Sequence, residues 1–420
     1  MRELPAEAQF GGLVPDRPSV EEPRRLDEFP QEQPPSEPGL RIPSLPPPPP
    51  PTSEKRLSSQ LKVAVKRIKL TGNTVFSDED LAEVIAPYQG RSLSSEDLQS
   101  LRYALTLYYI NHGFINSGAV IPDQQIDEGV LEVFIVEGKL TEIALEGNER
   151  LRDSYIADRL IIGSEDTLKL HQLQQRIQLL QQDRLIDRIN AELRPGMRPG
   201  ESILRVDIQE SRPIDLGLSF NNWRSPSVGS LQGEVYATAY NLTGFGDQVG
   251  GRYEHSEGFD KGSAFLSFPL TARDTRLIAY FDYSKADVVE EPFNALDISS
   301  KTTSYGLRLS QPLYQTVQHQ WLGALVLEKR QSESSLLGSP FSFSLGAQGG
   351  KTDVTVIRLL QQWVDRSPEQ VLALRAIFNM GIDAFGATIN SAKLPDGQFF
   401  YWLGQFQWLR RLWDTNNQIL

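Results

Sequence analysis

The sequence has no cysteine among its 420 residues. A disulfide framework and a thiolate metal site are therefore both excluded. The absence also suits a periplasmic or outer-membrane protein, because such a protein meets an oxidising compartment in which stray disulfides form. The formal net charge of -12 provides no basic surface and argues against a nucleic-acid partner.

Long hydrophobic runs are missing as well. No stretch of about 18 apolar residues occurs, so the sequence predicts no transmembrane helix, and a membrane role would have to use strands. The first residues, Met1 to Pro5, lead into acidic and proline-rich sequence in place of the apolar core of a signal peptide. Taken literally, this start indicates the cytosol, but we expect that the natural start lies upstream.

Sequence signals for catalysis and for metal binding are also lacking. There is no phosphate loop, dinucleotide fingerprint or nucleophile elbow. Gly244-x-Gly246 is typical of a hairpin turn, and Glu290-Glu291 of a solvated loop. We therefore predict no enzymatic activity, no cofactor and no metal site. The histidines are scattered without the spacing of metal ligands, at His112, His171, His255 and His319.

The chain is long enough for more than one domain, and its 39% apolar and 23% charged residues are ordinary for a folded protein. Residues 1–60 differ from the rest because they are rich in proline, glutamate and arginine. Such a segment buries too little apolar surface to become ordered, so we predict a disordered linker. Its run Pro46 to Pro51 predicts a stiff polyproline II spacer, or alternatively a ligand for a proline-binding domain.

A repeat with a spacing of 75 residues follows this linker. Ile68-x-Leu70-x-Gly72-Asn73 returns as Ile143-x-Leu145-x-Gly147-Asn148, and the apolar positions that follow keep the same interval. Each unit has the pattern strand, helix, helix, strand, strand. We therefore predict two duplicated modules, at residues 61–138 and 139–212, each large enough for a small core.

Two helices of the first module are marked by capping boxes, Ser77-x-x-Asp80 and Ser94-x-x-Asp97. The second of them, expected over Ser95 to His112, carries two apolar stripes. The stripe expected to face the core consists of Leu98, Leu101, Leu105 and Tyr108. The other consists of Tyr103, Leu107 and Ile110.

The second stripe has two interpretations. Either the helix packs on both sides, or the stripe borders a groove beside an edge strand at Ala119 to Ile121, where an extended peptide could add as a strand. The second interpretation predicts that a substrate protein binds at Tyr103, Leu107, Ile110, Ala119, Val120 and Ile121. In the second module the corresponding helix has one apolar stripe among six glutamines, which suits a spacer better than a binding surface.

Helix signals nearly vanish over residues 213–420. About ten extended runs of roughly ten residues follow, divided by turn sequences, and several of them alternate apolar and mostly polar residues. This pattern predicts an antiparallel transmembrane β-barrel with lipid outside and water inside. A soluble sandwich is the alternative, and the runs near Trp321 and Val354 alternate poorly. Aromatic residues expected to form interfacial girdles are Trp223, Phe245, Phe268, Tyr280, Trp363, Phe399, Tyr401 and Trp402.

Over residues from about 60 to 412 the sequence resembles the outer-membrane transporters of two-partner secretion, the haemolysin and filamentous-haemagglutinin secretion/activation family of the Omp85 superfamily. The resemblance is most specific in the first module, which looks like the family's first POTRA module. The residues that carry it are Gly113-Phe114, Ala119-x-Ile121-Pro122-Asp123-Gln124, Asp127-x-Gly129-Val130-Leu131 and Val136-Glu137-Gly138.

The resemblance implies an α+β fold of two periplasmic POTRA modules (β-α-α-β-β) followed by the barrel. The family barrel is expected to have sixteen strands, but only about ten are counted here. The family's Val-Arg-Gly-Tyr loop motif, its signal peptide and its plug helix are not found in this sequence. Phe281-Asp282 and Ile382-Asp383 do not replace the partner Phe-x-Asp motif. We therefore expect a chain cropped at its start and incomplete at its C-terminal side.

The function implied by the resemblance is type Vb secretion. The POTRA modules would recognise an unfolded haemolysin-like or adhesin-like exoprotein in the periplasm, and the barrel would release it across the outer membrane. We predict a monomer surrounded by outer-membrane lipids, without nucleic acid or cofactor. The alternatives are a β-barrel assembly factor and a truncated periplasmic peptide-binding protein that does not transport.

Overall fold

The structure is a computed structural model, and it describes residues 40–41, 62–163, 166–367, 369–391, 394–411 and 418–419. Most of the predicted proline-rich linker lies outside these residues. None of the helices within the described ranges has the length and apolar character needed to cross a membrane.

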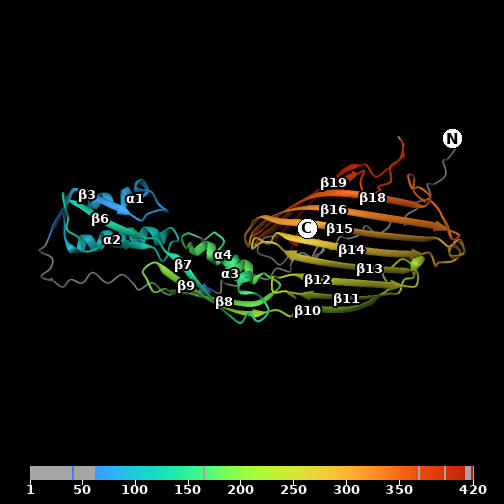
Figure 1. The fold of residues 1–420 in the computed structure, drawn as a ribbon, viewed down its shortest axis with the longest axis horizontal. Coiled ribbons are helices and arrows are strands. Elements are labelled where there is room, and N and C mark those ends of the chain that lie inside the picture. Colours follow the sequence, from blue (N-terminus) through green and yellow to red (C-terminus); the bar gives the residue numbers. More distant parts are fainter. Residues whose placement is uncertain are drawn as a thin grey trace. The chain divides into compact units, whose positions relative to one another are not determined.

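The first module contains two helices and a small mixed sheet of order β3-β6-β5 (Figure 1). β3 runs parallel to β6, and β5 runs antiparallel to it. β2 and β4 form a separate antiparallel pair. The elements are β2 (Val63–Val65), β3 (Arg67–Thr71), α1 (Asp78–Ile85), the 3-10 helix η2 (Ala86–Tyr88), β4 (Arg91–Leu93), α2 (Ser95–Asn111), β5 (Gly118–Val120) and β6 (Val130–Val136).

Both predicted capping boxes are present in this module. Ser77 and Ser94 accept hydrogen bonds from the backbone N–H groups of Asp80 and Asp97, whose carboxylates accept in return. The core also largely follows the predicted stripe of α2, since Leu101 and Leu105 are fully buried. Leu98 and Tyr108 are partly buried and pack against the same core. Tyr109, which was not in the predicted stripe, is fully buried because the last turn of α2 packs against Phe76 and Phe114.

The second module repeats the plan and confirms the predicted order of strands and helices. Its strand β7 runs parallel to β9, as β3 does to β6. Its own core includes Leu160, Leu173 and Ile177. The elements are β7 (Lys139–Glu146), α3 (Asp153–Ile161), α4 (Leu170–Gln181), β8 (Ile186–Pro195) and β9 (Glu201–Glu210).

A short strand from the predicted linker joins this second sheet. β1 (Leu40–Arg41) pairs in parallel with β8, so that the sheet order is β1-β8-β9-β7. The prediction of a disordered linker therefore does not hold at these two residues. The reason is long-range: β8 is an edge strand with free backbone groups, which composition does not show.

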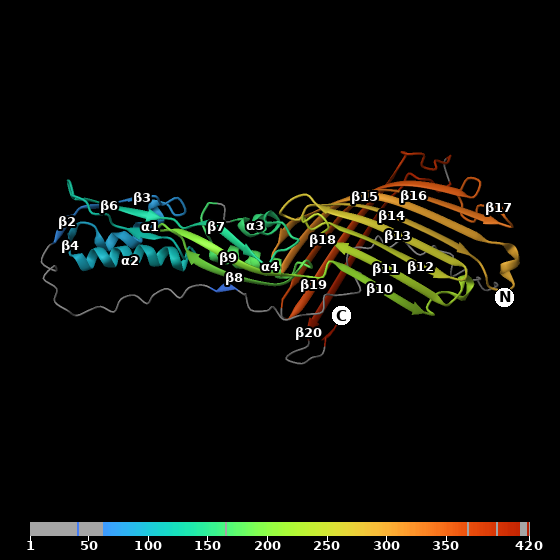
Figure 2. The ribbon, with the colours of Figure 1, turned by 60° about the horizontal axis from the view of Figure 1, so that its bottom comes forward.

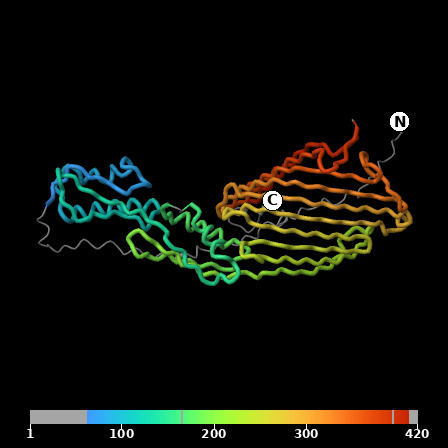
Figure 3. Tube along the Cα trace, viewed as in Figure 1, coloured from blue at the N-terminus to red at the C-terminus, as the bar shows by residue number. Residues whose placement is uncertain are grey.

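The rest of the described chain forms one antiparallel sheet, in which each long strand pairs with the next (Figures 2 and 3). Within the described residues, β10 pairs only with β11. The strands are β10 (Ile214–Asn221), β11 (Gln232–Tyr240), β12 (Gln248–Ser256), β13 (Phe259–Pro269), β14 (Arg276–Asp287), β15 (Ser299–Gln315), β16 (His319–Leu336), β17 (Ser339–Pro340), β18 (Lys351–Arg366), β19 (Gln370–Ile382), β20 (Phe400–Arg411) and β21 (Gln418–Ile419).

The two faces of this sheet have opposite character. On β15 and β16, the exposed side chains Leu307 and Leu325 alternate with the buried polar side chains Arg308 and Glu328. Successive residues of a strand point to opposite faces, so the apolar set lies on one face and the polar set on the other. We call these the outer face and the inner face. A sandwich would bury its apolar face against a second sheet, so the predicted membrane sheet is confirmed and the sandwich alternative is wrong.

Two runs that alternate poorly in sequence are nevertheless regular strands. The segments around Trp321 and Val354 form β16 and β18, which pair over 15 residues from His319 to Glu333. Their inner face is partly apolar, with Ala324 and Val356 both buried. This mixture on the inner face, and not an irregular backbone, weakens their sequence pattern.

Candidate functional site

The repeated Gly-Asn pair holds the first loop of each module. Gly72 and Gly147 both have φ of +85°, which favours glycine. A Cβ atom would lie 2.4 Å from the backbone oxygen of Ile135 at the first position, and 2.1 Å from that of Ile208 at the second. The glycine is therefore required both by the backbone conformation and by the close approach of the last strand of each module.

The glutamate of the Val-Glu-Gly signature anchors the same loop. Glu137 accepts hydrogen bonds from the backbone N–H groups of Thr74 (2.7 Å) and Val75 (2.8 Å) and from the hydroxyl of Tyr109 (3.0 Å). Glu210 repeats this in the second module with the N–H groups of Arg150 and Leu151. These signature residues are structural, and they position the loop before each first helix.

Asn116 and the signature glycine Gly138 take part in a contact between the two modules. The Asn116 amide donates to the backbone oxygen of Gly200 (3.0 Å) and to the hydroxyl of Ser202 (2.8 Å). A Cβ atom on Gly138 would lie 1.9 Å from this amide, so glycine leaves the space that Asn116 occupies. The glycine of the Val-Glu-Gly signature therefore serves a contact between the two modules.

The predicted docking residues of the first module do not form one surface. Tyr103 and Leu107, on α2, are 46% and 37% exposed, and Ile110 is half-buried. Val120 is 43% exposed but points to the face of the sheet that lies away from the helices, where it pairs across strands with the equally exposed Phe134.

Two members of the predicted set belong to the core. Ala119 is buried beside Ile135, and Ile121 packs against the same cluster. The alternation of β5 turns the Ala119 side chain toward α2. The predicted addition of a peptide strand beside Ala119 to Ile121 would use the backbone of β5, and it stays a prediction. The backbone N–H of Ala119 is also engaged, since it donates to the Thr106 hydroxyl (3.1 Å). Phe134 was missed, although alternation along β6 could have identified it.

The inner face of the sheet carries a buried charge cluster across β14, β16 and β18. Glu328, 1% exposed, accepts two hydrogen bonds from Arg358 (2.8 and 2.9 Å) and one from the Tyr280 hydroxyl (2.6 Å). Arg330 lies 3.6 Å from the same carboxylate. A buried carboxylate is stable only with such partners, so the cluster makes this part of the inner face polar and charge-balanced.

A second cluster lies farther along the same face. Glu254 accepts from Arg224 (2.8 Å) and lies 3.4 Å from Lys261, and Glu234 lies 3.3 Å from Arg252. Both clusters were missed by the sequence analysis. The signal that could have found them is a charged residue at the polar positions of alternating strands.

Several predicted girdle aromatics do not face outward. Tyr280 and Tyr401 lie on the inner face, where Tyr280 bonds to Glu328 and Tyr401 pairs across strands with Asn379. Phe245 lies in a turn, with the Arg152 guanidinium 4.0 Å above its ring. Trp402 does lie on the outer face and is exposed, and Trp321 and Trp363 are cross-strand partners there.

The second module contacts the turns at one end of the large sheet. Arg152, before α3, donates from its backbone to the Gly244 oxygen (3.0 Å). A Cβ atom on Gly246 would lie 2.5 Å from the ring of Tyr155. Gly244-x-Gly246 is therefore a hairpin turn, as predicted, and its two glycines allow α3 to pack directly on it.

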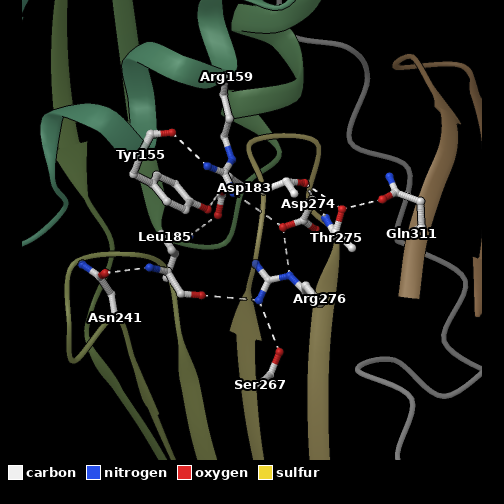
Figure 4. Close-up of polar contacts among 12 residues, drawn as sticks. Tyr155, Arg159, Asp183, Leu185, Asn241, Ser267, Asp274, Thr275, Arg276 and Gln311 are labelled. Atoms are coloured by element: carbon white, nitrogen blue, oxygen red, sulfur yellow. Dashed lines mark hydrogen bonds and ion pairs between the residues drawn. The ribbon is translucent and has the colours of Figure 1, made fainter. Parts of the chain in front are cut away.

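Charged side chains extend this contact (Figure 4). Arg159 stacks on the ring of Tyr155 at 3.7 Å and lies 3.6 Å from Asp274, which also pairs with Arg276 at 2.9 Å. The Tyr155 hydroxyl donates to Asp183 (2.6 Å), and burial, together with the charge of this carboxylate, raises the pKa of Tyr155. The network links α3 with the β13–β14 turn. No group of three or more acidic or histidine side chains suited to a metal ion occurs within the described ranges.

Comparison with known proteins relates both parts of the chain to one family. Residues 63–138 match the ShlB-type POTRA domain, and residues 200–420 match the family described as haemolysin secretion/activation protein ShlB/FhaC/HecB. Among curated proteins, the outer membrane transporter CdiB of Dickeya dadantii is 26% identical over 186 residues, which is 44% of this chain and 32% of the relative.

Two further relatives carry transporter names. The heme/hemopexin transporter protein HuxB of Haemophilus influenzae is 22% identical over 45% of this chain and 34% of its own length. The hemolysin transporter protein HpmB of Proteus mirabilis is 26% identical over 44% of this chain and 32% of its own length. The matches thus span about a third of each curated relative.

Solved structures show the same fold. CdiB from Escherichia coli aligns with a TM-score of 0.64 at 21% identity, covering 86% of this chain and 67% of that one. CdiB from Acinetobacter baumannii aligns with a TM-score of 0.50 at 18% identity, covering 76% and 62%. Because the family match covers more than half of the sequence, the chain belongs to the haemolysin secretion/activation protein family ShlB/FhaC/HecB.

Proposed function

We propose that this chain recognises an unfolded exoprotein through its periplasmic modules. Its large sheet forms part of the wall of the pore through which that exoprotein is secreted. The large sheet lies in the outer membrane, and the POTRA modules lie in the periplasm. The observation that carries the proposal is the arrangement of two modules before a sheet with an apolar outer face and a charged inner face. We assign the chain no catalytic activity, and we propose that it acts as a monomer among outer-membrane lipids.

The inner face supports passage of an extended polypeptide. Its acidic and basic groups are paired with each other, as in the Glu328–Arg358 and Glu254–Arg224 contacts. Paired charges keep the inner face hydrated. Because the two signs balance, the face has no strong field that would retain an oppositely charged polypeptide. The relatives named for heme/hemopexin and hemolysin transport support a secreted protein as the substrate.

Docking of the exoprotein is proposed at the exposed apolar side chains of the first module. Tyr103 and Leu107 on α2, and Val120 with Phe134 on the far face of the sheet, flank the edge strand β5. An unfolded chain exposes its own apolar side chains to water. Contact with exposed apolar residues of the module removes both surfaces from water and is therefore favourable.

The test is secretion of the exoprotein encoded next to this chain's gene. Replacing Leu107 and Val120 with aspartate should reduce secretion at least tenfold and leave the amount of chain in the outer membrane unchanged. Ile161→Asp is the matched control, because Ile161 on the second module is equally exposed at 37%. Unchanged secretion by the Leu107 and Val120 variant would remove this docking surface.

A further inference from the structure

The long strands of the large sheet have one end at each side of the membrane. Residues 211–213 alone separate β9 of the periplasmic second module from β10, so β10 begins on the periplasmic side. Each long strand pairs antiparallel with the one before it. β14 therefore ends, and β15 begins, at the outer leaflet of the membrane.

The outer face of the sheet changes character toward this end. Across β14, β15, β16 and β18, the cross-strand partners of one apolar row are Ala279, Leu307, Leu327 and Ile357. In the next row toward the outer leaflet, Tyr305 lies opposite Lys329. Two rows beyond that, the partners are Lys285, Lys301, Glu333 and Lys351. Aromatic and charged residues beyond an apolar band mark the level of the lipid headgroups.

The four lysines at this level differ in their partners. Two of them are paired with carboxylates, at 2.7 Å for Lys285 and Asp287 and at 2.9 Å for Lys351 and Glu333. The other two, Lys301 and Lys329, form no ion pair with any carboxylate in the described part of the chain. Two positive charges thus stay at the headgroup level without a carboxylate of the protein to balance them.

Lys301 is held beside a like charge. It lies directly opposite Lys285, and its Nζ atom is 5.7 Å from the centre of the Tyr283 ring. Like charges directly opposite each other in a sheet are destabilising, so the two lysines favour an anion beside them. Glu333, the partner of Lys301 on its other side, does not supply this charge because it pairs with Lys351.

Lys329 is tied to an exposed aromatic residue. Its ammonium group donates to the backbone oxygen of Phe385, in the loop between β19 and β20. An ammonium group has three donor hydrogens, so two remain for a ligand. Phe385 has a φ of +54°, which is unusual for a bulky residue, and it is 68% exposed. The loop therefore holds an aromatic residue at the headgroup level next to an ammonium group.

We propose that Lys301 and Lys329 bind a lipid of the outer leaflet whose headgroup carries two phosphates, and that Tyr305 and Phe385 contact the apolar part of this lipid. On β16, Lys329 lies four residues from the partner of Lys301, which is roughly 13 Å along the strands. This spacing suits two phosphates of one headgroup better than one small anion. The inference rests on the membrane position of the sheet and not on recognition of an exoprotein.

The test measures lipid binding by the full chain purified from outer membranes in an uncharged detergent. Diphosphoryl lipid A should bind at least tenfold more tightly than monophosphoryl lipid A, because the second leaves one lysine without a phosphate. Inorganic phosphate in large excess should not displace the diphosphoryl lipid. Displacement by inorganic phosphate would show a site for free anions and would overturn the lipid site.

Variants assign the binding to the two lysines. Lys301→Gln/Lys329→Gln should bind diphosphoryl lipid A at least tenfold more weakly than the unmodified chain. Lys351→Gln/Glu333→Gln is the control on the same face, because it removes a lysine that is already paired, and it should bind within twofold of the unmodified chain. Lys66→Gln/Lys69→Gln, in the first module, removes the same two charges away from the membrane and should also bind normally.

Three results would contradict the proposal: equal affinity for the two lipids, full affinity in Lys301→Gln/Lys329→Gln, or an equal loss in Lys66→Gln/Lys69→Gln. The comparison of the two lipids uses the unmodified chain, so it decides the matter even if a variant fails to reach the outer membrane. None of these measurements involves secretion. A chain that binds the lipid but does not secrete an exoprotein would overturn the proposed function alone.

Discussion

At the scale of single residues, glycines decide where the chain can pass close to itself. Gly72 and Gly90 both have positive φ, at +85° and +73°. They differ in their surroundings, because a Cβ atom on Gly72 would meet the backbone of Ile135 at 2.4 Å, whereas one on Gly90 would meet nothing within 4 Å. The pair therefore separates backbone strain from steric exclusion.

We predict that Gly72→Ala destabilises the first module by about 3 kcal/mol or more, and that Gly90→Ala costs about 1 kcal/mol. The loss is larger at position 72 because the alanine Cβ would clash with the backbone oxygen of Ile135, which cannot move aside without disturbing β6. The measurement is the urea concentration at which the first module becomes susceptible to protease in the intact chain. Equal losses for the two variants would show that strain alone requires glycine at position 72.

At the scale of elements, the two helices of the first module depend on their capping boxes. Hydrogen bonds donated by the Ser77 hydroxyl and backbone N–H lower the pKa of Asp80. The backbone N–H and hydroxyl of Ser94 lower the pKa of Asp97 in the same way. Each carboxylate is therefore more stable in the folded module than in the unfolded chain.

A lowered pKa sets the direction of the pH dependence. The stabilisation by Asp80 and Asp97 is fully present above the unfolded value of about 3.9 and is lost as the pH falls through the lower folded value. We predict that acidification from about pH 5 to pH 2 destabilises the first module less in Asp80→Asn/Asp97→Asn than in the unmodified chain. Urea-dependent proteolysis at each pH measures this. The control is Asp123→Asn, in the loop after β5, and this variant should lose as much stability on acidification as the unmodified chain. If Asp123→Asn also lost less stability, the effect could not be assigned to Asp80 and Asp97.

At the scale of the whole molecule, the faces of the large sheet decide which substitutions the membrane tolerates. Leu327 lies on the outer face of β16 and is exposed, whereas Ser332 of the same strand lies on the inner face and is half-buried beside Thr302. The first side chain faces hydrocarbon and the second faces the polar interior.

We predict that Leu327→Lys disfavours membrane insertion by about 2 to 4 kcal/mol and that Ser332→Lys has little effect. The ammonium group would lie in hydrocarbon in the first variant and among polar groups in the second. The fraction of chain recovered in outer membranes measures the difference. Equal recovery would contradict the assignment of the two faces.

Much of this architecture could be predicted from local patterns. The Gly-Asn pairs at Gly72 and Gly147 revealed the duplication, and both capping boxes marked helix starts correctly. Alternation predicted the two faces of the sheet, except around Trp321 and Val354, where the sequences of β16 and β18 alternate poorly. These features depend on residues that are near neighbours in sequence, so composition and spacing carry them.

The candidate site was predicted less well, because it depends on contacts between distant residues. Helical spacing placed Tyr103 and Leu107 correctly at the surface, but it could not show that Ala119 turns into the core or that Val120 points away from them. Tyr280 was expected among the lipids, yet it bonds to Glu328, which lies 48 residues along the chain.

Local periodicity was thus sufficient for the type and order of the main helices and the long strands, since 3.6-residue and 2-residue patterns follow from backbone geometry alone. Which edges stay open, which charges meet and which loop touches which helix were decided only when the chain folded. The pairing of β1 with β8 is the clearest case. Two unremarkable residues in a proline-rich segment become a strand because an edge 150 residues away offers them hydrogen bonds.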